Sequence, residues 1–100
     1  MNLLYESEYF KCYQCDSQRC FFLSYEGKTI RMTCCQLLAF RTKVSRIDLS
    51  SHFSGENEHG IEILSLCNRE HLLILDTHQL IDLKQLVKVT FGMFELNDLV

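Results

Sequence analysis

An internal repeat is the feature that most constrains what this 100-residue chain can fold into. When the sequence is shifted against itself, residues 29–44 align with residues 72–87, and Gln36 falls on Gln79. Short apolar helices also resemble one another by chance, so the segments that precede the two helices decide whether the alignment reflects a repeat. Each has hairpin character with its turn in register, which favours two copies of a hairpin-then-helix unit.

The first copy predicts a tight hairpin followed by a helix. Pairing Tyr25 with Lys28 across a Glu26-Gly27 turn gathers the apolar residues of both strands on one face. That face carries Phe21, Leu23, Ile30 and Met32. The opposite face is more polar, so one side of this hairpin is expected to form core.

The second hairpin is apolar on both faces. Leu64, Leu66, Leu73 and Leu75 occupy one face, and Ile63, Leu72 and Ile74 occupy the other. A hairpin of this kind is typical of a position covered on both sides. We therefore expect it to be central in the fold or to lie at an interface.

Both helices have recognisable starts. Thr33 stands three residues before Gln36, and Asp76 or Thr77 plays the same part before Gln79, which is a capping-box pattern. Apolar residues then recur at helical spacing, which indicates one buried stripe per helix. The stripes are Leu37, Phe40, Val44 and Ile47 in the first helix, and Leu80, Leu83, Val87, Phe91 and Phe94 in the second.

These patterns predict a single α+β domain over residues 1–100. The first unit covers about residues 12–47, a mobile linker residues 48–60, and the second unit about residues 61–96. The expected architecture is a duplicated ββα-ββα fold, with a four-stranded, mainly antiparallel sheet and two helices packed on one face.

Composition narrows the location and the partners. No apolar run approaches the roughly 20 residues of a membrane span, and the acidic start lacks the features of a secretory signal. We expect a cytoplasmic protein, where six cysteines favour metal ligands, reactive thiols or buried residues over disulfides. The net charge of −3 disfavours binding to nucleic acid or to an anionic membrane.

The cysteines supply the candidate site. The hairpin register places Cys20 opposite Thr33, so it lies near the two adjacent cysteines of the first helical turn, and a C-x-x-C pair precedes the hairpin. Four thiolates suit tetrahedral zinc. The expected ligands are Cys12, Cys15, Cys20 and Cys34, with Cys35 as an alternative fourth ligand. The competing interpretation is that Cys20 and Cys35 are small buried residues and the C-x-x-C is incidental.

Two resemblances accompany these cysteines. A C-x-x-C knuckle, a hairpin and a helix that begins with cysteines resemble a treble-clef zinc arrangement, although adjacent Cys34 and Cys35 replace two cysteines three residues apart. Together with Leu23-Ser24-Tyr25 and the Thr33 to Phe40 segment, the chain also resembles a family of short uncharacterised proteins from Bacteroidetes. That resemblance implies a bacterial cytoplasmic protein of unknown role, with Cys12 and Cys15 as motif positions.

The functional expectation is a zinc-stabilised structural or interaction module. Its partner would be a protein or a second copy, bound through Phe91 and Phe94 of the second helix. The alternatives are a thiol-dependent redox protein or sensor that uses Cys34 or Cys35, and a metal-free interaction domain. No catalytic motif or small-molecule site is apparent, so an enzyme is not expected.

Overall fold

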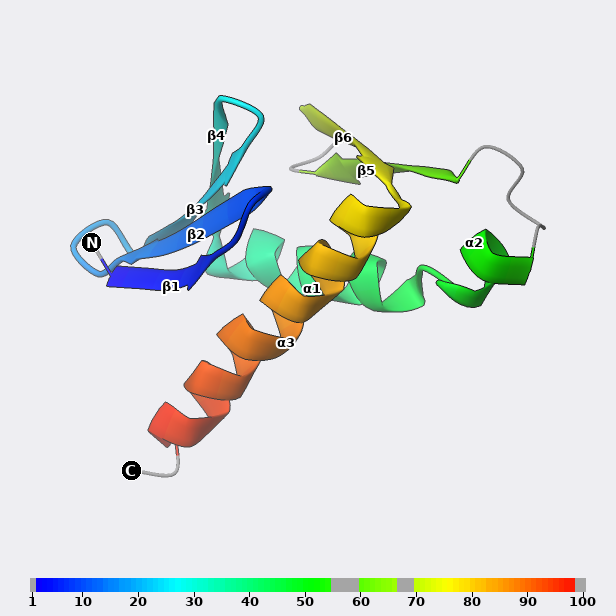
Figure 1. The fold of residues 1–100 in the computed structure, drawn as a ribbon. Helices are drawn as coiled ribbons and strands as arrows, with labels where there is room; N and C mark the ends of the chain where they lie inside the picture. The colour runs from blue at the N-terminus through cyan, green and yellow to red at the C-terminus, as the bar shows by residue number, and fades with distance from the viewer. Residues whose placement is uncertain (1, 55–59, 67–69, 99–100) are drawn as a thin grey trace.

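The structure, a computed structural model, describes residues 2–54, 60–66 and 70–98, and at residues 54 and 93–98 it describes the backbone alone. Its elements follow one another as strands, helices, strands and a long final helix (Figure 1). They are β1 (Asn2–Glu6), β2 (Phe10–Cys15), β3 (Cys20–Tyr25), β4 (Lys28–Thr33), α1 (Cys34–Arg46), α2 (Ser50–Ser54), β5 (Ile61–Leu66), β6 (His71–Asp76) and α3 (Thr77–Asp98).

Strands β1 to β4 form one antiparallel sheet in chain order, and β5 and β6 form a separate two-stranded sheet. The mixed α/β class agrees with the prediction. The strands of the two predicted copies, however, do not share one sheet. Residues 2–6 and 10–15 form two further strands that complete the larger sheet, and the C-x-x-C expected to form a knuckle lies in the second of them. The aromatic residues there, among them Phe10, have the high strand propensity that this requires.

The predicted pairing of the β3–β4 hairpin is confirmed. Tyr25 pairs with Lys28, and Cys20 with Thr33, at the two ends of the ladder. Glu26 and Gly27 both have positive φ values, 48° and 78°, as the tight turn between twisted strands requires. A glycine adopts this conformation without strain, which explains its place at the second turn position.

Both capping boxes are also confirmed. The Gln36 backbone N–H donates to Thr33 Oγ1 at 3.2 Å, and the Thr33 N–H donates to Gln36 Oε1 at 2.9 Å. At α3, Asp76 is the capping residue: Gln79 N donates to Asp76 Oδ1 at 2.8 Å, and Asp76 N donates to Gln79 Oε1 at 3.0 Å. These reciprocal bonds satisfy backbone donors that the first turn of a helix leaves free.

Helix α3 joins the two sheets. It contacts β1 and β2 of the larger sheet, β5 and β6 of the smaller one, and crosses α1 (Figure 1). A second link comes from the β3–β4 turn, where the Tyr25 hydroxyl donates to the Ile74 carbonyl at 2.6 Å. One continuous core therefore forms between helices and sheets, and its largest fully buried side chains include Phe10, Leu23, Phe40, Leu73 and Leu83.

The expected linker is partly ordered into α2. The His52 ring explains why this segment is fixed, because Nδ1 lies 2.9 Å from Thr77 Oγ1 and Nε2 lies 3.1 Å from Glu62 Oε1. These contacts join α2 to β5 and to the start of α3. Residues 55–59 lie outside the described part of the chain.

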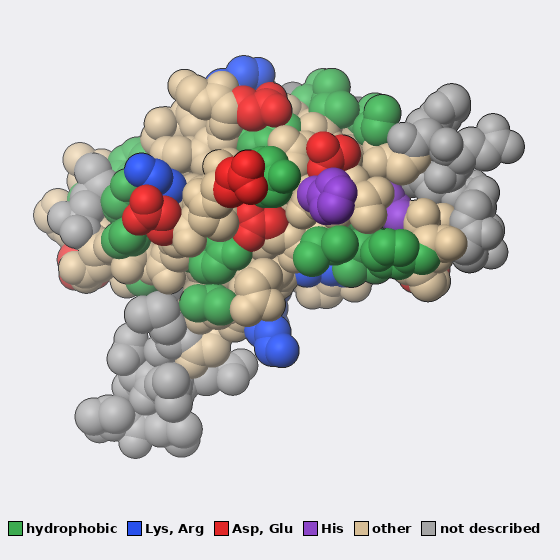
Figure 2. Space-filling model, in the orientation of Figure 1, with side chains coloured by type: hydrophobic (Ala, Val, Ile, Leu, Met, Phe, Trp, Pro, Cys, Tyr) green, Lys and Arg blue, Asp and Glu red, His purple; other side chains and the backbone are tan. Residues whose placement is uncertain are grey.

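The β5–β6 hairpin is not central in the fold of this chain, because only one of its faces is covered; its place at an interface stays a prediction. Its inner face is core, with Leu64, Leu66, Leu73 and Leu75 buried. On its outer face Ile63 is 67% exposed and Ile74, its cross-strand partner, is 59% exposed. Hydrophobic side chains accordingly gather on the surface over this hairpin (Figure 2). The reason is that both helices pack against the same side of β5 and β6.

Candidate functional site

The C-x-x-C pair lies within a strand, which separates its two cysteines. Successive side chains of a strand point to opposite faces, so residues three apart face opposite ways. Cys12 pairs with Leu23 and is fully buried on the face that meets α3. Cys15, at the end of β2, lies on the other face. In the knuckle expected from the sequence, both thiols could turn to one metal ion; in a strand they cannot.

Cys15 has a different neighbour, Cys20, which is its direct cross-strand partner at the end of the β2–β3 hairpin. Cys34 opens α1 and, with Cys20 and Phe21, lines a small hollow of about 220 Å³ at the same end of the sheet. Cys35 follows on the exposed first turn of α1. The structure thus gathers Cys15, Cys20 and Cys34 at one end and leaves Cys12 in the core.

The described residues contain no group of three or more Cys, His, Asp or Glu side chains placed to hold a metal ion. Cys67 lies outside these residues. A zinc ion bound by Cys12 and Cys15 together would require β2 to rearrange. The zinc site therefore stays a prediction, which metal analysis of protein purified without an affinity tag would test.

The two cysteines of the C-x-x-C differ in acidity as well as in position. Burial raises the pKa of Cys12 to about 11, which keeps its thiol neutral. The Thr90 hydroxyl offsets this slightly, although it forms no hydrogen bond of ordinary geometry. The Ser17 hydroxyl and then the Gln18 backbone N–H lower the pKa of Cys15. Cys15 is thus the more reactive thiol of the pair.

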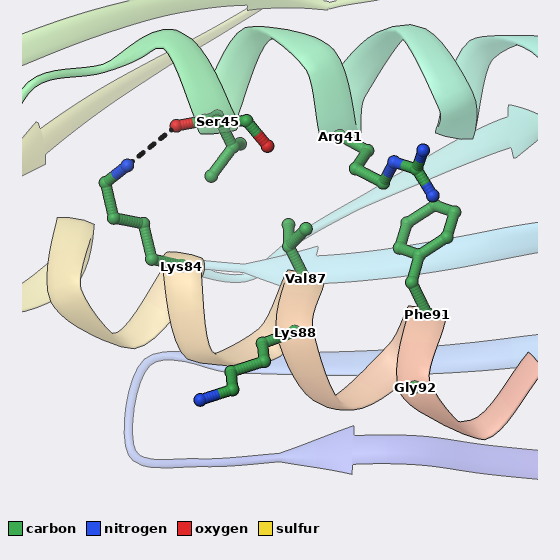
Figure 3. A pocket seen from close by; sticks show the side chains of 8 residues that line it. Arg41, Ser45, Lys84, Val87, Lys88, Phe91 and Gly92 are labelled. Atoms are coloured by element: carbon green, nitrogen blue, oxygen red, sulfur yellow. Dashed lines mark hydrogen bonds between the residues drawn. The ribbon is translucent and has the colours of Figure 1, made fainter. Parts of the chain in front are cut away.

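A groove of about 680 Å³ lies between α1 and α3. The groove is lined from α1 by Arg41, Val44 and Ser45, and from α3 by Lys84, Val87, Lys88 and Phe91. Figure 3 shows Val87 pointing from α3 toward α1. None of the described residues that line it is acidic. The groove therefore combines three cations with an apolar floor.

Each cation has a distinct environment. The Arg41 guanidinium lies over the Phe91 ring, 4.7 Å from its centroid, which fixes both side chains at one end of the groove. Lys84 Nζ donates to the Val44 carbonyl at 2.9 Å, near the C-terminal end of α1 (Figure 3). Lys88 is exposed and makes no hydrogen bond or ion pair within the described residues. Its charge is therefore available to a ligand.

Phe91 is one of the two residues expected at an interface from the sequence, whereas the lysines beside it in the groove were not expected there. The signal was present, because Lys84, Lys88 and Phe91 are spaced four and three residues apart and share one face of a helix. Phe94, the other predicted contact, has a side chain outside the described residues. Pairing this face with Arg41 needed the crossing of α1 and α3, which the sequence does not specify.

The chain was compared with protein-family models, curated proteins and solved structures. No protein-family model, no curated protein and no solved structure matches the chain. Within the described residues, no helix has the length and apolar character needed to cross a membrane.

Proposed function

We propose that this chain is a protein-interaction module whose α1–α3 groove binds an acidic, partly apolar segment of a partner protein. The observation that carries the proposal is the union of Arg41, Lys84 and Lys88 with an apolar floor in a groove without a described acidic residue. The whole chain has a net charge of −3, whereas the described lining of this groove carries three cations and no acidic side chain. Such a contrast favours recognition of a negative ligand.

The apolar floor argues for a polypeptide segment over a simple anion. Val44 and Val87 form the apolar floor of the groove, and the Phe91 ring, beneath the Arg41 guanidinium, closes one end of the groove. An amphipathic helix presents carboxylates and apolar side chains at spacings that fit a groove between two helices. Its apolar residues would displace water from the floor while its carboxylates approach Arg41 and Lys88.

A second copy of the chain is a poorer occupant. A two-fold dimer through this groove would set its three cations against the same three in the partner, and like charges across an interface are destabilising. Nucleic acid is also a poorer occupant, because three cations in a molecule of net charge −3 give little of the extended positive surface that phosphate backbones need.

Fluorescence anisotropy with a labelled helical peptide of Glu, Leu and Phe tests the proposal. We expect saturable binding that weakens as salt is added, because the ion pairs are exposed at the groove rim. Lys88→Glu should weaken binding about fivefold to tenfold, which corresponds to roughly 1 to 1.4 kcal/mol.

Lys28→Glu is the matched control, because it makes the same charge change at an exposed turn of β4, on another element. It should leave the affinity unchanged. Equal weakening by both variants would mean that net charge, and not the groove, governs binding. Tighter binding of a single-stranded oligonucleotide than of the peptide would refute the proposal and indicate nucleic acid as the ligand. Self-association that Lys88→Glu abolishes would refute it as well and indicate a second copy of the chain.

A further inference from the structure

Cys15 and Cys20 form a cross-strand pair that the proposed interaction function does not use. Cys15 ends β2, Cys20 begins β3, and the two are direct partners in the antiparallel ladder. The loop between them is tight, since Arg19 has a positive φ of 52° and its N–H donates to the Asp16 carbonyl at 3.3 Å. The hairpin therefore holds the two cysteines opposite each other.

The geometry of the pair suits a disulfide bond. Directly opposite residues of an antiparallel ladder have Cα atoms about 4.5 or 5.5 Å apart, and their side chains share one face of the sheet. Disulfides span Cα separations of about 4.4 to 6.8 Å, which includes both values. The ladder register therefore places the two Cα atoms within the range that a disulfide bond spans.

Both thiols also turn toward the same part of the loop. Cys15 Sγ lies 3.4 Å from Ser17 Oγ, and Cys20 Sγ lies 3.8 Å from Gln18 Oε1. Both contacts are with side chains of the short loop that joins β2 to β3.

We propose that Cys15 and Cys20 form a reversible intramolecular disulfide in the folded protein when it meets a low-molecular-weight disulfide. The Cys15 thiolate attacks one sulfur of the oxidant, forming a mixed disulfide and releasing one small thiolate. Cys20 then loses its proton, and its thiolate attacks the Cys15 sulfur and releases the second. Two electrons pass to the oxidant, whose two thiolates take up the protons that the cysteines lose.

Cys15 attacks first because it is the more exposed of the two, at 8% against 1% for Cys20. The neighbouring Cys34 lines a hollow with Cys20 and is the competing partner for the second step. Cys12 takes no part, because it faces the other side of the sheet within the core. The arrangement thus assigns the reaction to one pair among several cysteines.

The test treats the folded full chain with glutathione disulfide, blocks remaining thiols with N-ethylmaleimide and identifies the linked peptides by mass spectrometry. Trypsin cuts after Lys11, Arg19 and Lys28, so Cys15 and Cys20 fall into peptides 12–19 and 20–28. We expect these two peptides to be joined, with fragmentation placing the link on Cys15 and not on Cys12. Reduction with dithiothreitol should separate them again.

Variants assign the partners. Cys15→Ser and Cys20→Ser should each abolish the link, whereas Cys35→Ser, at the exposed start of α1, should leave it intact. The wild-type measurement stands without the variants if one of them fails to fold. A link from Cys20 to Cys34, glutathione retained on Cys15, or a bond that forms only in denatured protein would overturn the proposal.

Discussion

At the scale of single residues, the geometry of a strand gives two cysteines of one short motif opposite chemistry. Cys12 is fully buried against the helices, while Cys15 lies among loop donors on the other face of the same sheet. Burial disfavours a thiolate, and hydrogen bonds to sulfur favour it. The same residue type three positions apart is therefore a packing group in one case and a reactive group in the other.

The buried thiol predicts a specific alkaline sensitivity. The unfolded chain loses the Cys12 proton near pH 8.5 to 9, whereas the folded protein holds it until its pKa of about 11. The folded state then binds more protons than the unfolded state, so stability falls as the pH rises through this interval. The contribution lost is roughly 2 to 3 kcal/mol.

Urea unfolding of the wild type and of Cys12→Val across this interval measures the effect. The variant should lose less stability than the wild type between pH 9 and 11, and the two should change in parallel below pH 8. Tyrosines whose pKa values are raised, such as Tyr5, titrate in both proteins, so the difference between the curves isolates Cys12. Parallel curves throughout would show that the thiol is not held neutral.

At the scale of elements, one carboxylate fastens the last helix to the start of the chain. The hydroxyls of Tyr5, on β1, and of Ser7, in the turn after it, both donate to Asp82 of α3. Burial, then the hydrogen bond to Asp82 and the charge of that carboxylate, raise the pKa of Tyr5 to about 12. Polar bonds here reinforce the apolar contact between α3 and the larger sheet.

Removing this carboxylate should weaken the docking of α3. We expect Asp82→Ala to lower the free energy of unfolding by about 1.5 to 3 kcal/mol, because two charge-assisted hydrogen bonds are lost. Asp16→Ala is the control: it removes an exposed carboxylate that accepts one bond from Asn2, at 3.3 Å, and should change stability by less than about 0.5 kcal/mol. Equal losses in urea unfolding would contradict this role.

Much of the strand register and of the helix boundaries could be predicted from local sequence signals. The Tyr25–Lys28 register and both capping boxes follow from neighbouring residues, and they are confirmed. The assembly of the sheets was not predictable in the same way. Strands β1 and β2 depend on contacts with α3, the distant end of the chain, and a C-x-x-C motif suggested a knuckle where the backbone is extended. The α1–α3 groove likewise required a helix crossing that no local pattern encodes.

At the scale of the whole molecule, the small β5–β6 sheet is covered on one side only. Its inner leucines join the common core, and its outer isoleucines and Leu72 face outward. The hydrophobic pattern of the sequence is apolar on both faces of this hairpin, so it predicts that both are covered. It does not tell how many helices are available to cover them. Two helices suffice for one face.

This asymmetry predicts unequal effects for neighbouring residues of β6. Leu73→Ala should destabilise the protein by about 2 to 5 kcal/mol, because it leaves a cavity in a fully buried position. Ile74→Ala, next to it, should change stability by less than about 1 kcal/mol, because that side chain is 59% exposed. Thermal unfolding of both variants compares the faces directly, and a large loss for Ile74→Ala would place that residue in a covered position.

The contact between α3 and β1 also has a consequence for synthesis on the ribosome. Each of the four strands of the larger sheet pairs only with its neighbours in the sequence, so this sheet can form while the rest of the chain is still being made. Helix α1, which follows directly, covers the part of the apolar face over β3 and β4, but the part over β1 and β2 is not covered until α3, which begins 44 residues after β4 ends, leaves the exit tunnel. The newly made sheet presents an apolar face to the cell during that interval, when a chaperone has its best opportunity to bind.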